Sequence, residues 1–348
     1  MGDSRLNNFE VKSKIHNYKV NFVDDYFDTL KDIVSDGDVI IIDEKIVKLY
    51  PKINDISCVK IMLEANEKTK SFNGVGDVIK ILLDLNFKKN YKFIAIGGGI
   101  IQDITAFISM TMFRGVKWYF FPTTLLAQGD SCIGSKSSIN FEDKKNQLGG
   151  FYPPNEIFID INFTKTLTVG DLYSGLGEML HYFLISGKSD FEYFKDNINN
   201  LNNLIKRSLE IKKSMIEIDE FDVGPRLVFN YGHSFGHAIE SITNYKVPHG
   251  IAVCHGMDIA NFLSLQFGYM TELEYLEIHQ IILDIIEKND YNFKLDDIDT
   301  LISKMRKDKK NISNTFGLIL TKGIGDMFLI QKSELDIKNN LIKYNKNI

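Results

Sequence analysis

Four side chains in the second half of the sequence have the types and spacing of a metal site. His233 and His237 lie four positions apart within 232–240, so one face of a helix would carry both, and His249 follows soon after. Glu178 lies in a separate stretch with helical spacing. Two histidines and a glutamate form a known catalytic zinc set that leaves one position open for water or substrate. The simplest pairing takes His233 and His237 as ligands. The alternative is that these histidines only pack in the core or at the surface.

A run of three glycines could bind a phosphate group. Gly97–Gly99 follow the apolar segment Tyr91–Ile96, which predicts a buried strand, and a helix is expected from Asp103 to Phe113. The N–H groups of such a turn and of the helix N-terminus favour a bound anion. Asp43 ends an earlier predicted strand and is the type of residue that binds a ribose hydroxyl. The run falls short of the full GxGxxG pattern, so a plain tight turn is the alternative.

Several cations lie beside glycines, prolines or other turn residues, where side chains can converge on an anion. A phosphate or carboxylate pocket built from a few of them is compatible with an acidic protein. Taken singly, each is better explained as a solvated surface charge. The candidates are Lys136, Lys144, Lys145, Arg226 and the lysines Lys307, Lys309 and Lys310 around Asp308.

The elements that would position these residues change character near residue 160. Before it, strand-like and helix-like segments alternate, which predicts a parallel sheet with helices on its faces. After it, the pattern is mostly helical. We therefore expect an α/β domain over residues 1–160 and a helical domain over 161–348. The predicted strands are 38–43, 91–96, 116–122 and 316–320, and the predicted helices are 75–85, 103–113, 172–186, 189–197, 201–217, 233–243, 251–267 and 271–288.

Length and composition agree with two ordinary globular domains. The chain has 348 residues and a net charge of -5, which argues against nucleic acid or an anionic membrane as the main partner. Three widely spaced cysteines predict no disulfide framework and a reducing, cytoplasmic setting. The N-terminus lacks an apolar signal region, and the most apolar stretch, 93–113, is too interrupted to span a membrane. The Asn- and Lys-rich end, IKNNLIKYNKNI, predicts a frayed terminus.

Beyond these local patterns, the sequence resembles the 3-dehydroquinate synthase family of sugar-phosphate cyclases from about Asp43 to Leu320. The resemblance rests on long motifs in a fixed order, which chance does not explain. They are Glu67-x-x-Lys70, Gly97–Gly99 with Asp103, Phe113–Gly115, Pro122–Ala127, Asp130–Lys136, Lys145–Pro154, Asn230–Glu240 and His249-Gly250.

The resemblance implies a Rossmann-like NAD-binding domain, a helical metal-binding domain and an active site between them. It revises the metal set to Glu178, His233 and His249, with zinc or cobalt as the cation, and makes His237 an acid–base residue. The implied NAD contacts are Asp43, Glu67, Lys70, Gly98, Gly99, Asp103, Thr123, Thr124 and Lys145. The implied substrate contacts are Arg114, Asp130, Lys136, Asn146, His181, Lys212, Arg226, Asn230 and a lysine of the pair Lys309 and Lys310. The implied catalytic group comprises His237, Lys136, Asp130, Asp222 and Arg226.

The resemblance also implies a reaction. Family members oxidise a ring hydroxyl with bound NAD, eliminate phosphate, reduce the carbonyl with the same NADH and close a carbocycle. We expect conversion of 3-deoxy-arabino-heptulosonate 7-phosphate to 3-dehydroquinate in a cytoplasmic homodimer, with Arg114 reaching the substrate of the neighbouring subunit. The sugar phosphate is a small-molecule partner, and no nucleic acid or membrane partner is expected.

Four positions depart from the family pattern, and His181 matters most because the family usually has a lysine near substrate hydroxyls there. Histidine is shorter and only partly charged at neutral pH. Because of these four positions, a related cyclase that acts on another sugar phosphate remains an alternative function. A net NAD- and metal-dependent alcohol dehydrogenase and a non-catalytic NAD-binding relative are further alternatives. The four are Gln102, Ser135, His181 and Asp222.

Overall fold

The computed structural model describes residues 8–142, 144–288, 291, 293–306 and 315–347. The chain forms two compact units. Unit 1 contains the described part of 1–167 together with Lys212–Phe221, and unit 2 contains Thr168–Ile211 and the described part of 222–348. Helix α7, Leu201–Ile218, therefore contributes its first part to unit 2 and its last part to unit 1.

Unit 1 is built on a seven-stranded sheet in the order β1-β2-β9-β6-β5-β3-β4. All neighbouring strands are parallel except β1 and β2. The central strands are almost wholly buried, as expected for apolar strands covered on both faces. The strands are β1 (Phe9–Val11), β2 (Tyr18–Phe22), β3 (Val39–Asp43), β4 (Val59–Leu63), β5 (Lys92–Gly97), β6 (Lys117–Pro122) and β9 (Glu156–Ile159).

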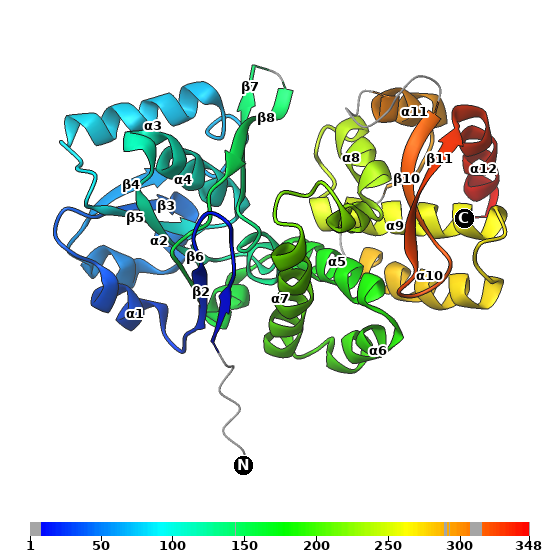
Figure 1. Cartoon of the computed structure of the whole chain (residues 1–348), viewed down its shortest axis with the longest axis horizontal. Coiled ribbons are helices and arrows are strands. Elements are labelled where there is room, and N and C mark those ends of the chain that lie inside the picture. Colours follow the sequence, from blue (N-terminus) through cyan, green and yellow to red (C-terminus); the bar gives the residue numbers. More distant parts are fainter. Residues whose placement is uncertain (1–7, 143, 289–290, 292, 307–314, 348) are drawn as a thin grey trace, which may run out of the picture. The chain divides into compact units, whose positions relative to one another are not determined.

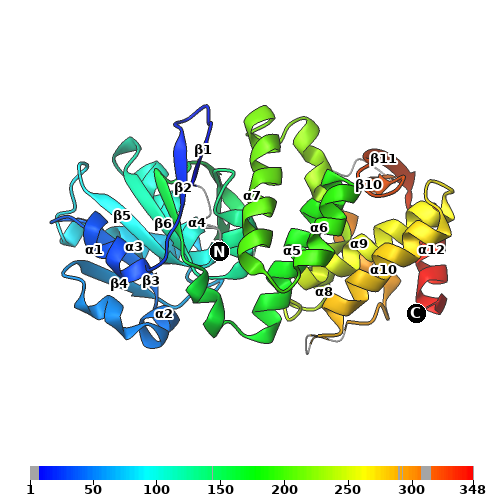
Figure 2. The same cartoon turned by 90° about the horizontal axis from the view of Figure 1, so that it is seen from below.

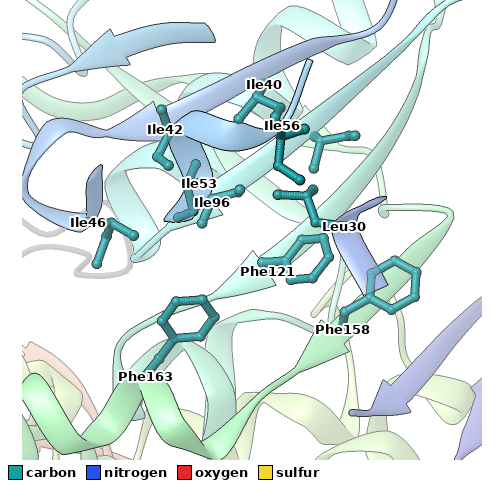
Figure 3. Close-up of a cluster of buried hydrophobic side chains, with 11 residues drawn as sticks. Leu30, Ile40, Ile42, Ile46, Ile53, Ile56, Ile96, Phe121, Phe158 and Phe163 are labelled. Carbon is teal, nitrogen blue, oxygen red and sulfur yellow. The ribbon is translucent and has the colours of Figure 1, made fainter. Parts of the chain in front are cut away.

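Helices cover both faces of this sheet (Figure 1). On one face, α1 (Tyr26–Ile33) and α2 (Glu44–Leu49) pack on side chains of β3, β5, β6 and β9, and Figure 3 shows the resulting cluster around Ile42, Ile96 and Phe121. On the other face lie α3 (Phe72–Asp84) and α4 (Gly99–Thr111), which bury Val75 and Ile104 among other apolar side chains. A separate antiparallel hairpin pairs β7 (Lys136–Phe141) with β8 (Lys144–Phe151). Short helical turns span Pro51–Asp55, Met112–Arg114, Ala127–Ser131 and Ile161–Thr166.

The strand order reverses beside β3, and this reversal creates a binding position. The chain passes from β3 through α2 to β4 on one side, and from β4 through α3 to β5 on the other side of β3. In open α/β sheets, ligands bind at such a switch point, outside the carboxyl ends of the strands. Here those ends are Asp43 and the glycines that follow β5.

Unit 2 is mainly helical, with α9 at its centre (Figure 2). Helix α9 packs against α5, α8, α10 and α12, and this position explains why nearly all its side chains are buried. A two-stranded sheet of β10 (Thr315–Thr321) and β11 (Met327–Ser333) lies beside them. The helices are α5 (Val169–Ser186), α6 (Lys188–Asn197), α8 (His233–Ile242), α9 (His249–Gln266), α10 (Glu272–Ile286), α11 (Ile298–Arg306) and α12 (Glu334–Asn347), with the short turn η5 (Pro225–Asn230) before α8. Within the described residues, no helix has the length and apolar character needed to span a bilayer.

The predicted fold class is confirmed, and each predicted strand and helix has a counterpart in the structure within a few residues. The prediction of a frayed C-terminus is wrong. Residues 334–347 form α12, in which Ile337, Leu341 and Tyr344 are buried. These three follow the i, i+4, i+7 spacing of an amphipathic helix, which the many Asn and Lys residues between them obscured.

Candidate metal and nucleotide sites

Glu178, His233 and His249 converge at one point in unit 2, although they come from α5, α8 and α9. Nε2 of His233 lies 3.5 Å from Oε1 of Glu178, and Nε2 of His249 lies 3.5 Å from Oε2 of the same carboxylate. Two ligand atoms at about 2.1 Å from a tetrahedral cation would lie about 3.4 Å apart. The three side chains therefore fit a divalent cation such as zinc or cobalt.

The Nδ1 atoms of His233 and His249 are hydrogen-bonded in a way that orients both rings as a metal site requires. Nδ1 of His233 donates to the carbonyl of Tyr231 at 3.1 Å, and Nδ1 of His249 donates to Oε2 of Glu240 at 3.1 Å. Because both partners only accept, each Nδ1 carries the proton and each Nε2 keeps its lone pair. Glu240 is a supporting residue that sequence reasoning missed, although the motif 230–240 contains it.

Glycines explain how three helices approach so closely. Each proposed ligand is the sequence neighbour of a glycine at a helix contact. A Cβ on Gly250 would lie 1.8 Å from the carbonyl oxygen of Ser174, on α5. A Cβ on Gly177 would lie 2.6 Å from the carbonyl oxygen of Gly250, and one on Gly232 would lie 2.9 Å from that of Val253. Only glycine permits these backbone contacts, so the ligand positions depend on them.

Charge in the centre favours an ionised carboxylate. Burial raises the pKa of the Glu178 carboxyl, but His233, His249 and His181, when they are protonated and no cation is bound, outweigh burial and hold that pKa well below its usual range. Glu178 is only 2% exposed, so these neighbours are what make a carboxylate tolerable there. A second set of possible ligand atoms comes from His237, Glu240 and His249, so His249 is shared between two sets.

Two other predicted residues of unit 2, His237 and His181, lie beside this centre, and His181 contacts the turn η5, which carries further predicted residues. His237 is exposed, one helical turn beyond His233, and its ring centroid is 5.8 Å from that of His249. His181 is fully buried, with Nε2 at 2.8 Å from the carbonyl oxygen of Phe229 and its ring 5.0 Å from that of His233. The turn η5 carries the buried Arg226 and Asn230, whose Nδ2 donates to the carbonyl of Leu227 at 3.0 Å. Asp222 is partly buried, with a φ of 59°.

In unit 1, the switch point fits the phosphates and ribose of a dinucleotide. Helix α4 begins at Gly99 after the N-cap Gly98, and no side chain caps it, so its first N–H groups face a possible anion. A Cβ on Gly98 would lie 2.9 Å from Cγ2 of Thr124, whereas nothing lies within 4 Å of one on Gly99. Thr123 donates its backbone N–H to the carbonyl of Gly97 at 3.0 Å. Asp43 caps α2 by accepting from the N–H of Lys45 at 2.9 Å.

A polar network of unit 1 joins the remaining predicted NAD contacts. Nζ of Lys70 donates to Oδ2 of Asp103 at 3.0 Å and to Oδ1 of Asn146 at 2.9 Å. Burial raises the pKa of the Asp103 carboxyl, and Lys70 opposes this effect. The predicted substrate residue Asn146 therefore lies in the same network as these two NAD candidates.

Glu67 and Lys145 form a second pair, with 2.5 Å between Oε1 and Nζ. Burial raises the pKa of Glu67, but the bonds from Lys145 and Asn140 outweigh it and lower the pKa overall. Sequence reasoning missed Asn140, which is 5% exposed. Its Nδ2 donates to Oε2 of Glu67 at 2.7 Å, and its Oδ1 accepts from the N–H of Asn146 at 3.0 Å. It lies in the hairpin β7–β8, which the sequence did not predict.

Further predicted substrate residues lie elsewhere in unit 1. Nζ of the buried Lys212 donates to both the carbonyl and Oδ1 of Asp130, at 2.7 Å each. Lys136 is exposed at the start of β7, and Arg114 is exposed on a turn. Lys309 and Lys310 lie outside the described residues. The structure thus groups most predicted residues into a metal set, a nucleotide set and the Asp130–Lys212 pair, and their roles stay predictions.

A parallel sheet with a nucleotide-type switch point and a helical unit with a three-ligand cation site define a class of metal-dependent, nucleotide-binding enzymes. The chain belongs to the 3-dehydroquinate synthase family. The 3-dehydroquinate synthase N-terminal family matches residues 60–174, and the 3-dehydroquinate synthase C-terminal family matches residues 175–311.

Individual relatives agree with this membership. A 3-dehydroquinate synthase of Alkaliphilus metalliredigens is 38% identical over 278 residues, which cover 77% of each chain. A 2-deoxy-scyllo-inosose synthase solved with carbaglucose-6-phosphate, NAD+ and Co2+ is 22% identical and shares the fold with a TM-score of 0.86 over 96% of this chain and 98% of that one. A probable glycerol dehydrogenase of Sinorhizobium meliloti 1021 is similar at a TM-score of 0.66, 11% identity, and 94% and 96% coverage. The predicted family is confirmed.

Proposed function

We propose that the protein is a 3-dehydroquinate synthase, which converts 3-deoxy-arabino-heptulosonate 7-phosphate to 3-dehydroquinate and phosphate. The observation that carries the proposal is the set Glu178, His233 and His249, with its ligand spacing and oriented Nδ1 atoms, in a chain of this family. This lyase activity needs a hydride carrier and a cation, and the two sites described above are suited to hold them.

When bound, NAD would supply a reversible hydride acceptor and a zinc or cobalt ion would polarise a substrate oxygen. Glu178, His233 and His249 would hold the cation, and the residues at the switch point, with the Lys70 and Glu67 networks, would hold NAD. His237 is exposed beside the cation set, so one of its ring nitrogens can take up and return a proton. Lys136, Lys212 and Arg226 supply positive charge that matches a phosphate and a carboxylate.

One assay tests this function against its alternatives. The purified protein is incubated with the heptulosonate phosphate, a divalent cation and catalytic NAD, while phosphate, NADH and product are followed. Phosphate release without net NADH is expected, because the hydride returns to the substrate. Stoichiometric NADH would instead indicate an alcohol dehydrogenase. Turnover of another sugar phosphate, with none of this one, would indicate a related cyclase. No turnover of any of them would contradict an enzymatic function.

We also propose that the enzyme is a cytoplasmic homodimer in which Arg114 serves the partner's substrate site. Arg114 is exposed on a turn where Phe113, Arg114 and Gly115 have φ values of 52°, 62° and 117°. Such conformations are costly for residues other than glycine and persist where a function requires them. The described cysteines are free, which agrees with a reducing compartment.

Mixing two inactive variants tests the dimer proposal. A heterodimer of Arg114→Ala and Lys136→Ala would rebuild one complete site from two subunits. Random exchange of subunits should then restore about a quarter of the wild-type activity. No recovery after verified exchange would show that Arg114 acts within its own subunit or not at all.

A further inference from the structure

The carboxylate of Glu220, two residues after the end of α7, is buried and accepts hydrogen bonds from three donors, although no catalytic role is proposed for it. Glu220 is 2% exposed. Its Oε1 accepts from the hydroxyls of Ser13 and Ser135 at 2.6 and 3.1 Å, and its Oε2 accepts from the N–H of Lys14 at 2.7 Å. All four residues belong to unit 1. A buried carboxylate with this many donors is a fixed structural point, because removal leaves every donor unsatisfied.

The turn that Glu220 holds is strained and directly precedes Lys136. Ser135 has a φ of 65°, in the left-handed region that favours glycine, and Gly134 has a φ of 106°. A serine in this conformation persists only when its surroundings hold it. The bond from its hydroxyl to Glu220 is one such restraint, and the bond from the N–H of Gly134 to the hydroxyl of Tyr18 at 3.0 Å is another. Ser135 is buried whereas Lys136 is exposed, so the turn ends where the lysine emerges.

The same segment is also attached at its other end. Lys212 donates to the carbonyl and carboxylate of Asp130, at 2.7 Å each. Residues 130–136 are thus bonded to residues 212–220 at two places, through Asp130 with Lys212 and through Ser135 with Glu220. The turn has further restraints, because the carbonyl of Ser135 accepts from the N–H of Tyr152 at 2.7 Å and Lys136 pairs with Phe151 in the hairpin. These backbone bonds hold the main chain on the β8 side, and the Glu220 bond is the restraint on the Ser135 side chain, next to Lys136.

We propose that Glu220 is a positioning residue that sets the location of Lys136 for substrate, using Ser135 as the link. The proposal rests on the proposed function, in which Lys136 contacts the sugar phosphate. Glu220 itself need not touch the substrate. Loss of its carboxylate would remove one restraint from the strained turn, and the direction in which the Lys136 side chain leaves the turn would be less well defined.

The test compares Glu220→Ala with Glu220→Gln and with Glu217→Ala. Glu217 is a matched control, because its Oε1 also accepts from the N-terminal segment, at 2.9 Å from the N–H of Lys12, but no bond to residues 134–136 is among its contacts. Glu220→Ala should raise KM for the heptulosonate phosphate about tenfold with a smaller change in kcat, since one charge-assisted contact is lost. Glu220→Gln should stay near wild type, because its amide oxygen can accept from Lys14 and its NH2 can donate to the serine hydroxyls.

Thermal unfolding of each variant separates positioning from stability. Glu217→Ala should lower the melting temperature without changing KM. Equal KM values for Glu220→Ala and Glu217→Ala would overturn the proposal, as would an unrescued Glu220→Gln. If Glu220→Ala does not fold, Ser135→Ala provides the same test, because it removes the hydroxyl link and leaves the carboxylate in place.

Lys136→Ala distinguishes failure of this inference from failure of the proposed function. Wild-type kinetics for Lys136→Ala would refute the substrate role on which the inference rests. Impaired Lys136→Ala together with unimpaired Glu220→Ala and Ser135→Ala would refute only the positioning role.

Discussion

Adding one methyl group at Gly250 should destroy the proposed metal site although none of the three ligand side chains is changed. The new Cβ would lie 1.8 Å from the carbonyl oxygen of Ser174 and 3.1 Å from the backbone nitrogen of Glu178. A carbon and an oxygen in contact are about 3.3 Å apart. Helices α5 and α9 must therefore separate by about 1.5 Å near Ser174. Metal–ligand distances tolerate only about 0.2 Å, so Glu178 and His249 could no longer bind the same ion.

The expected result for Gly250→Ala is a loss of metal affinity greater than about 100-fold, since even changes to supporting residues cost about 10- to 100-fold. The overpacked contact should also lower the free energy of unfolding by about 1–3 kcal/mol. Metal content after desalting and competition with a chelator measure the affinity. NAD binding, followed by titration calorimetry, should stay close to wild type because the switch-point residues belong to unit 1.

Two other glycines provide graded controls. A Cβ on Gly236 would lie 3.2 Å from atoms of Ala252, which requires a shift of only a few tenths of an ångström. Gly236→Ala should therefore weaken metal binding much less than Gly250→Ala. Nothing lies within 4 Å of a Cβ on Gly76, in α3, so Gly76→Ala should leave metal binding unchanged. Wild-type metal affinity in a folded Gly250→Ala protein, or equal losses in Gly250→Ala and Gly236→Ala, would refute the reasoning.

Three further predictions concern supporting and buried residues. Asn140→Ala removes the donor to Oε2 of Glu67 and leaves the Lys145 bond to Oε1, so NAD affinity should fall about tenfold in a fluorescence titration while metal affinity is unchanged; an unchanged NAD affinity would contradict the network. Glu240→Ala removes the acceptor that orients His249, and chelator competition should show a loss of metal affinity of about 10- to 100-fold. Burial lowers the pKa of His255 to about 4, below its ordinary 6.5. As the pH falls, the unfolded chain therefore binds a proton at His255 before the folded chain does. The free energy of unfolding should decrease by at most about 3 kcal/mol between pH 6.5 and pH 4. Urea unfolding of His255→Leu should lack this part of the pH dependence, and an identical slope would contradict it.

The sequence predicted the buried central elements well and the edge elements poorly, for a physical reason. Val39–Asp43 and Lys92–Gly97 are continuous apolar runs, because helices cover both faces of the central sheet. The edge strand Val59–Leu63 is apolar apart from Lys60 but exposes Val59 and Met62, and the hairpin strand Lys144–Phe151 is largely polar; neither strand was predicted. That hairpin contains Asn140 in its other strand, which explains why a supporting residue of the NAD network was missed.

Residue types predicted the chemistry of the metal set, but spacing alone could not choose among its members. The four-residue interval makes His233 and His237 neighbours on α8, which favoured them as a pair. The structure instead brings Nε2 of His233 to Glu178, and His249 contributes from the next helix. This convergence depends on backbone contacts at Gly177, Gly232 and Gly250, which act between helices and leave no periodic signal within one segment.

For His181, the residue type and its surroundings in the structure lead to different expectations about its role. The sequence placed His181 near substrate hydroxyls, where the family usually has a lysine. In this structure the side chain is fully buried, and its Nε2 is bonded to the carbonyl of Phe229 in η5. That turn also carries Arg226 and Asn230, two predicted substrate contacts. With His181 in this position, its effect on substrate selection would pass through the placement of η5. Because His181 is buried, we expect it to act on substrate selection through the way α5 positions the neighbouring turn η5, and not through one contact with a substrate hydroxyl.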